Sequence, residues 1–524
     1  MILEYQGDRI MLANKIYHQR GEHIMPQGIL PYKYEEEKNN TGMTAYAGLP
    51  VYLDLASVLG LTDHIRTRMH VRTQGWTDEQ IITSLILLNL AGGDCVDDMN
   101  ILEKDEGFCK VLQRVELKGL SRQQHRAQTR RWRKEKHRSV PSPSAIFRYL
   151  EAFHDPGQEK LRVAGKAFIP LSNNYLQGLM KINGDFIASV QKHTPCTEAT
   201  LDQDATLAAT QKKDALFSYE GYKAYQPFTT WWAEQQMIIH TEFRDGNVPA
   251  GYEQLRVFID SLAMLPPGVT KVYLRSDTAG YQHDLLKYCE KGTNERFGRI
   301  EFAIGCDVTR EFKKAVAEAE EWKPFMKEVK GEIKPTGKEW AEVCFVPNAI
   351  GHSKKGPVYR YLATRELLRQ EELPGMEQQE LPFPTMSLEQ KRYKVYGIVT
   401  NRAIDGNELI NWYHKRCGKS EEAHSVMKED LAGGMFPSSL FGANAAWWWI
   451  MVLACNLNTA MKNLVLKKSW IPKRMKAIRF SLIALPGRII ERSRELFIRL
   501  AKGHPSFEVL LNARQRIMEF APSG

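Results

Sequence analysis

The sequence lacks the marks of a secreted, membrane-spanning or zinc-binding protein. Its eight cysteines are scattered and form no C-x-x-C pair, so neither a zinc site nor a disulfide framework is predicted. Its longest apolar runs, residues 81–88 and 445–455, are too short to cross a bilayer. Met1-Ile2-Leu3 is followed at once by Glu4, unlike a secretion signal, which begins with basic residues and continues with apolar ones. These absences predict a soluble protein of a reducing, intracellular compartment.

Internal repeats, low-complexity tracts and a functional phosphate loop are also missing. Residues 331–339 resemble such a loop, but five residues separate Gly331 from Gly337 instead of four, and Glu339 stands where Ser or Thr is needed. ATP binding at this segment is therefore excluded. What the chain does have is a formal charge of +10 and a pI near 9.0, which favour a polyanionic partner. Its 524 residues predict two to four domains.

The first part of the chain is predicted to be helical and basic after a mobile arm over residues 1–45. Within residues 46–196, Ile81, Leu85 and Leu88 recur at helical spacing. Residues 121–138 carry charge of nearly one sign, which indicates either a solvated linker or a DNA-binding helix. The candidate DNA contacts there are Arg126, Arg130, Arg131 and Arg133.

A further helix is expected directly after this basic run. Ser142 or Ser144 can cap it, Ile146 and its apolar neighbours form its buried face, and Arg148 stays exposed. A helix of this kind beside a basic run resembles part of a helix-turn-helix. DNA contact and plain packing are equally consistent with the pattern.

From residue 199 short β-rich segments alternate with helical ones, which predicts a mixed α/β core. Six strands are expected, at residues 199–206, 236–243, 271–276, 299–304, 358–363 and 393–400. The core is assigned to residues 197–306 and 391–440. The charged, proline-rich residues 307–390 are interpreted as an inserted segment, and residues 441–524 as a basic, helical C-terminal region, with the Trp447–Trp449 run in a helix core.

Acidic residues in three segments of the chain are candidates for chemistry. Strand alternation places Asp202 and Asp204 on one face, and Asp277 ends an apolar strand just before a glycine-containing turn. Glu421 and Lys428 lie about two turns apart on one face of a regular helix. Carboxylates in such a set can hold Mg²⁺, which completes its shell with water and phosphate oxygens. Separately, Asp204 could be an ordinary surface residue and Asp277 a helix N-cap.

In this order the motifs resemble those of DDE transposases from bacterial insertion sequences, the group with a Tyr-x-x-Arg-x-x-x-Glu-six-Lys signature. The resemblance covers residues 199–520 and includes Tyr413, Arg416, Glu421 and Lys428. It implies a ribonuclease-H-like α/β fold, a mixed β-sheet with flanking helices, an insertion before the glutamate, and helical N- and C-terminal regions. It also implies cytoplasmic, nucleoid-associated action in bacteria.

The activity implied by this resemblance is DNA transposition. The protein would bind the ends of its own element, cleave them with two Mg²⁺ ions, for which Mn²⁺ can substitute, and join the 3′-hydroxyl ends to target DNA. Asp204, Asp277 and Glu421 would be the catalytic metal ligands, while Tyr413, Arg416 and Lys428 would contact DNA phosphates. Double-stranded DNA is the expected partner, with a homodimer on paired ends and no membrane.

The signature has one departure. Counting from Arg416 places the acid at Ser420, so Glu421 is one residue late and Glu422 is its rival; Asp202 is the alternative to Asp204. A nuclease without strand transfer and an inactive DNA-binding derivative are the competing functions. The histidines near the acidic helix, His414 and His424, are expected at the surface or facing DNA, and Trp322 or Trp340 either packs in the core or stacks on an unpaired base.

Overall fold

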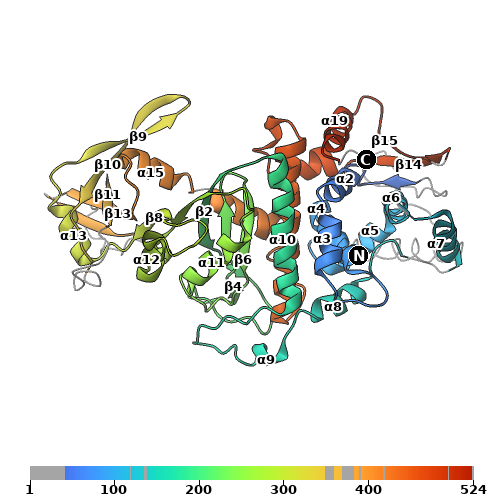
Figure 1. Ribbon diagram of the computed structural model, residues 1–524, viewed down its shortest axis with the longest axis horizontal. Helices are drawn as coiled ribbons and strands as arrows, with labels where there is room; N and C mark the ends of the chain where they lie inside the picture. The colour runs from blue at the N-terminus through green and yellow to red at the C-terminus, as the bar shows by residue number, and fades with distance from the viewer. Residues whose placement is uncertain are drawn as a thin grey trace, which may run out of the picture.

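The computed structural model describes residues 42–118, 120–134, 138–347, 359–368, 383–388, 391–416, 419–493 and 495–521. Figure 1 shows an elongated molecule, with a strand-rich end, a central sheet, and a helical end where β14, β15 and α19 also lie. Most of the predicted N-terminal arm, residues 1–41, lies outside the described residues.

The N-terminal region is helical, as predicted. Its main helices are α2 (Pro50–Val58), α3 (Leu61–Arg68), α4 (Asp78–Ala91), α5 (Met99–Lys104), α6 (Glu106–Glu116), α7 (Arg122–Lys134), α8 (Pro143–Glu151), α9 (Pro156–Glu159) and α10 (Asn174–His193). Thr77 and Gln80 form a capping box that starts α4, whose Ile81, Leu85 and Leu88 are buried. Ser142 caps α8, and Arg148 is exposed there, as expected.

The central sheet is mixed. Strands β6 (Met237–Glu242), β5 (Phe228–Trp232) and β2 (Glu198–Ala205) pair antiparallel, and β2, β7 (Lys271–Ser276) and β8 (Glu301–Cys306) pair parallel. The helices α11 (Gln254–Met264) and α12 (His283–Lys291) connect β6 to β7 and β7 to β8, and a small sheet of β3 (Ala208–Ala209) and β4 (Ala224–Tyr225) lies beside β5. The predicted α/β class, a mixed sheet with flanking helices, is confirmed and is consistent with the ribonuclease-H-like type.

The segment between β8 and the acidic helix continues the same sheet. After α13 (Arg310–Ala317) come β9 (Lys323–Val329), β10 (Glu332–Val343), β11 (Arg360–Leu367), β12 (Thr385–Leu388) and β13 (Lys391–Thr400). β13 pairs antiparallel with β8, so the ten strands form one sheet. β11 and β13 were predicted, whereas β5, β9, β10 and β12 were not, and the β9–β10 hairpin exposes most of its side chains.

The chain after β13 is largely helical, and this includes the predicted helical C-terminal region, residues 441–524. It contains α15 (Gly406–His414), α16 (Lys419–Ser425), the π-helical turns η3 (Val426–Asp430), η4 (Met461–Val465) and η6 (Arg479–Ile483), α17 (Phe441–Ala460), η5 (Lys468–Trp470), α18 (Met475–Ile478) and α19 (Ser506–Glu519). Trp447, Trp448 and Trp449 are buried in α17, as expected. The hairpin β14 (Gly487–Arg492) and β15 (Glu495–Arg499) was not predicted.

Helix α17 joins the two halves of the molecule. It packs on α4, α8 and α10 of the N-terminal region and on β6 of the sheet. Its Asn456 side chain accepts a hydrogen bond from the Ile238 backbone N–H at 2.9 Å and donates to Asn183 at 2.8 Å. No helix among the described residues is long and apolar enough to span a bilayer.

Candidate catalytic site

The parallel pairing of β2 with β7 sets Asp204 beside Asp277. Gln203 lies opposite Ser276 in the register, and the aspartates are the next residue on each strand. Because side chains alternate along a strand, both aspartates lie on the sheet face that also carries Asp202 and Arg275. Two residues 73 positions apart in sequence therefore meet at the carboxyl end of neighbouring strands.

Asp204 remains partly accessible and is surrounded by groups from the C-terminal helices. Its side chain is 19% exposed, with Arg416 Nη2 at 3.9 Å from Oδ1 and His424 Nδ1 at 3.8 Å from Oδ2. Burial lowers the pKa of His424 to about 4, helped by Lys428 and Arg416, so this imidazole is neutral near pH 7. His424 is thus buried beside Asp204, and the expectation of a surface position for it was wrong.

Asp277 combines a structural and an electrostatic role. Its carboxylate caps the short 3-10 helix η2 (Thr278–Gly280) by accepting from the Ala279 N–H at 3.1 Å. Burial raises the pKa of the Asp277 carboxyl, the charge of Asp204 raises it further, and Arg416 opposes both effects. The N-cap interpretation is therefore correct without excluding ligation. Two carboxylates that repel each other in this way are suited to share a cation.

Asp202 has a different environment from Asp204. Its side chain is 1% exposed, and both of its oxygens accept hydrogen bonds from Arg275, at 2.5 Å and 2.7 Å. This bidentate pair occupies the carboxylate. The geometry therefore favours Asp204 over Asp202 as the first metal ligand.

Tyr413 and Arg416 follow each other at the end of α15 and point to the same strands. The Tyr413 hydroxyl donates to the Ser276 carbonyl at 3.1 Å and lies 2.7 Å from the Tyr396 hydroxyl, and Tyr413 is buried. Arg416 Nη2 lies 3.5 Å from the Gln203 carbonyl. The charges of Tyr413, Asp204 and Asp277 raise the pKa of Arg416 even though its burial acts the other way.

Glu421 lies in α16, one turn before His424, but its side chain is outside what the structure describes. The Glu422 side chain is exposed. Lys428 lies in the π-helical turn η3 and donates from Nζ to the Leu207 carbonyl at 3.1 Å. A π-helical turn rotates less per residue than an α-helix, so the regular-helix spacing assumed between Glu421 and Lys428 was wrong.

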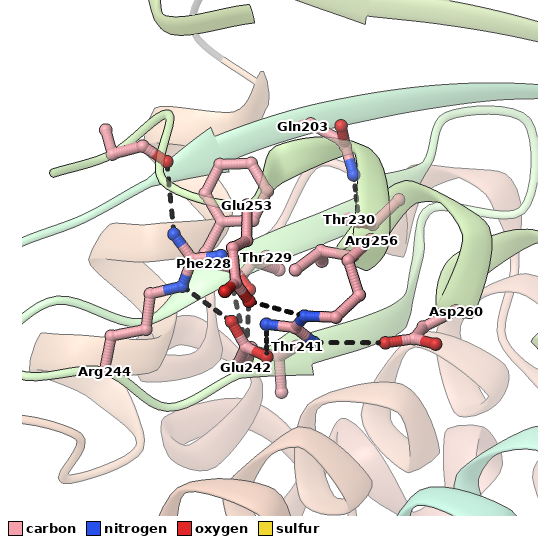
Figure 2. Close-up of polar contacts among 12 residues, drawn as sticks. Gln203, Phe228, Thr229, Thr230, Thr241, Glu242, Arg244, Glu253, Arg256 and Asp260 are labelled. Carbon is pink, nitrogen blue, oxygen red and sulfur yellow. Dashed lines mark hydrogen bonds and ion pairs between the residues drawn. The ribbon is translucent and has the colours of Figure 1, made fainter. Parts of the chain in front are cut away.

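A buried network supports the aspartates from the opposite face of the sheet. Gln254 of α11 donates to Gln203 at 3.1 Å and to Ser276 Oγ at 2.9 Å, and Gln203 donates to Thr230 Oγ1 at 3.2 Å. These contacts fix the residue before each aspartate. Figure 2 shows the Gln203–Thr230 bond and, nearby, the charged cluster in which Arg256 lies between Glu242 and Asp260.

The donor set fits a divalent metal in part. Asp204 and Asp277 provide hard carboxylate oxygens on one face, and α16, the helix that contains Glu421, reaches Asp204 through His424. Among the side chains that the structure describes, no group of three His, Cys, Asp or Glu residues is close enough to hold a metal. Glu422 is one of those described side chains, whereas Glu421 is not, so Glu421 remains the candidate for a third ligand.

The candidate DNA-binding arginines are separate from this site. Arg126 is exposed on α7, which Figure 1 places at the far end of the molecule from β2. Arg130, Arg131 and Arg133 also belong to α7, but their side chains are outside the described part of the structure. In the inserted segment Trp340 is buried, and Arg365 stacks on Trp322, so core packing accounts for both.

Sequence reasoning missed Arg275 and Tyr396, and it placed His424 at the surface, where the structure buries it. Arg275 had a signal: a charged residue inside the apolar strand 271–276 needs a buried partner, and only Asp202 on the neighbouring strand supplies one at that register. His414 is half-buried against Phe325, and burial together with Lys338 and Lys327 lowers its pKa to about 4. Its expected surface position is therefore only partly correct.

An aspartate pair at the ends of neighbouring parallel strands, next to Arg416 and on a mixed sheet, makes this edge of the sheet the candidate catalytic site. The sequence profile of the family described as Transposase DDE domain group 1 matches residues 37–364 and 384–522, and the chain belongs to this family.

Among solved structures, the chain is similar to a cryo-EM structure of the piggyBac transposase synaptic complex with hairpin DNA. The identity is 11% and the TM-score 0.38, over 83% of this chain and 80% of that one. No curated protein matches.

Proposed function

We propose that this protein is an active transposase that cleaves the ends of its own insertion sequence and joins the freed 3′-hydroxyls to target DNA. The observation that carries the proposal is the placement of Asp204 and Asp277 side by side at the ends of β2 and β7, next to Arg416. Family membership supports the class of reaction.

The carboxylates of Asp204, Asp277 and Glu421 would hold two Mg²⁺ ions, or Mn²⁺ in their place. The bound metal would supply charge stabilisation for the attacking and leaving oxygens of a phosphodiester. Arg416, held between the strand ends, would orient a phosphate through its planar fork, and Lys428 would add a point charge. Tyr413, being buried and bonded to Ser276, would hold Arg416 in place rather than touch DNA.

DNA recognition is assigned to the exposed basic helix α7. Its charged residues are all Arg or Lys, so it would attract the phosphate backbone. A homodimer on paired element ends would bring two catalytic sites to two ends.

The test uses DNA from the flanks of the gene, where short inverted repeats bounding this reading frame are expected. Purified protein should nick a labelled end duplex in Mg²⁺, and a pre-cut end should be joined to a target plasmid. Cleavage without joining would favour a nuclease, and end binding without cleavage in Mg²⁺ or Mn²⁺ would favour an inactive binder. Either result would overturn the proposal.

A further inference from the structure

The buried pair Asp202–Arg275 lies on the face of the proposed site, two residues before Asp204 and Asp277 on the same strands. Their side chains are 1% and 3% exposed and joined by two short hydrogen bonds. The pair therefore cross-links β2 to β7 immediately behind the carboxylates.

The same guanidinium also binds the helix that leads to the acidic segment. Arg275 Nη1 donates to the Trp412 carbonyl at 2.6 Å, and Arg275 lies over the Trp412 ring at 5.1 Å. Trp412 is in the last turn of α15, where a cation is favourable, and its carbonyl also accepts from the Lys415 N–H at 3.2 Å. One side chain thus fastens two strands and one helix end.

The end of α15 determines where the next helix begins. Beyond Trp412, Tyr413 reaches the Ser276 carbonyl and Arg416 lies 3.5 Å from the Gln203 carbonyl, so three successive contacts hold this end on β2 and β7. α16, which contains Glu421, starts only three residues after Arg416.

We propose that Asp202 and Arg275 form a positioning clamp that sets the distance between the Glu421 helix and the Asp204–Asp277 pair, and so determines metal affinity. This inference rests on the proposed function. It follows the general behaviour of groups that orient metal ligands without touching the metal. Asp202 acts through Arg275 and is not itself a ligand.

The chain offers a control. Arg162 and Asp245 form a second buried bidentate pair, with side chains 3% and 1% exposed and bonds of 2.6 Å and 2.8 Å. Arg162 also pairs with Glu159, donates to the Asp214 carbonyl, and lies over the Phe441 ring at 4.6 Å. These described partners are not residues of the proposed site.

The experiment compares Asp202→Asn and Arg275→Lys with Asp245→Asn and Arg162→Lys. Thermal unfolding should show similar losses of stability for the two pairs. Mn²⁺ affinity, measured by electron paramagnetic resonance of the free ion, should fall by about 10–100-fold in the clamp variants alone. Hydrogen exchange in residues 412–425 should accelerate in the same two variants and not in the controls.

Two results would overturn the clamp. In one, the clamp variants bind Mn²⁺ as tightly as the control variants. In the other, Arg275→Lys keeps wild-type affinity while Asp202→Asn loses it, which would make Asp202 a ligand. If Asp202→Asn does not fold, the Mn²⁺ affinities of Arg275→Lys and its control Arg162→Lys are compared instead.

Failure of the proposed function is distinguishable, because neither readout requires cleavage. A wild-type protein that binds Mn²⁺ but cuts no DNA would refute the transposase activity, while the four variants would still decide the clamp.

Discussion

The candidate catalytic site and the basic helix α7 use charge in opposite ways. At the site, Asp204 and Asp277 are partly or largely buried, fixed by strand register and supported by Gln254 from behind. On α7, Arg122 and Arg126 are exposed. Buried charges interact strongly but only at fixed geometry, whereas exposed charges attract DNA over a distance set by salt. Substitutions at the site should therefore reduce cleavage without changing DNA binding, and substitutions on α7 should do the reverse.

The largest effect is expected at the strand ends. Asp204→Asn or Asp277→Asn should reduce cleavage by about 10³-fold or more, since several kcal/mol of metal-based stabilisation is lost. Binding of end DNA should change little, as measured by gel shift. Asp260→Asn, on α11, is the control. Near-normal cleavage by either site variant would remove that residue from the metal centre.

The next largest effect on cleavage is expected from helix α16. Glu421→Gln should abolish cleavage, whereas Glu422→Gln should keep a substantial part, because adjacent helix residues point about 100° apart and only one can face the aspartates. Single-turnover cleavage in Mg²⁺ and Mn²⁺ compares them. If Glu422→Gln is the inactive variant, α16 presents its other face to the site.

Substitutions on the basic helix α7 should affect DNA binding and not cleavage. Replacing Arg126, Arg130, Arg131 and Arg133 by Gln should weaken end binding and reduce the slope of log K against log salt by up to about 4. Cleavage at saturating protein should be unaffected. Arg66→Gln with Lys314→Gln, two exposed cations on other helices, is the control. An unchanged slope would make α7 a solvated linker.

The smallest effect concerns stability without metal. Because the pKa of Asp277 is raised in the folded state, the native protein binds its proton more tightly than the unfolded chain, so the ionised group destabilises at neutral pH. Asp277→Asn should therefore be more stable in EDTA, by about 1 kcal/mol.

The stability difference between wild type and Asp277→Asn should vanish as the pH falls through the raised pKa. Below about pH 4 the Asp277 carboxyl is protonated in both the folded and the unfolded protein. Adding Mg²⁺ at neutral pH should reverse the order, because only the wild type binds it well. Thermal melts over pH provide the measurement, and a less stable variant in EDTA at neutral pH would contradict the assigned repulsion.

Much of the candidate site could be read from the chain because its signals are local. Asp277 directly follows the apolar strand β7, and strand alternation over residues 201–206 already places Asp202 and Asp204 on one face. Arg275 inside an apolar strand signals a buried partner, but identifying that partner as Asp202 needs the strand register, which joins residues 73 apart and is not visible in the sequence. The π-helical turn at Lys428 also has no mark in the sequence that distinguishes it from an α-helix.

The missed strands have a similar explanation. β9 and β10 form an exposed hairpin in which lysines and glutamates outnumber apolar residues, so their pattern looks like loop. β14 and β15 follow a long helical stretch, and β14 pairs with the short strand β1 (Met43–Thr44) from the other end of the described chain, with Met43 opposite Arg488. Partners so distant in sequence leave no local trace.

The position of α17 has a consequence for how the protein is made. This helix packs on α4 and β6, which are both synthesised long before it. The interval is longer still between the synthesis of β1 and that of its pairing partner β14. During translation the early helices and strands must remain without their central partner, so we expect the nascent chain to acquire its native core late and cooperatively. Chaperone dependence and sensitivity to C-terminal truncation should therefore be high, even for truncations that spare every catalytic residue.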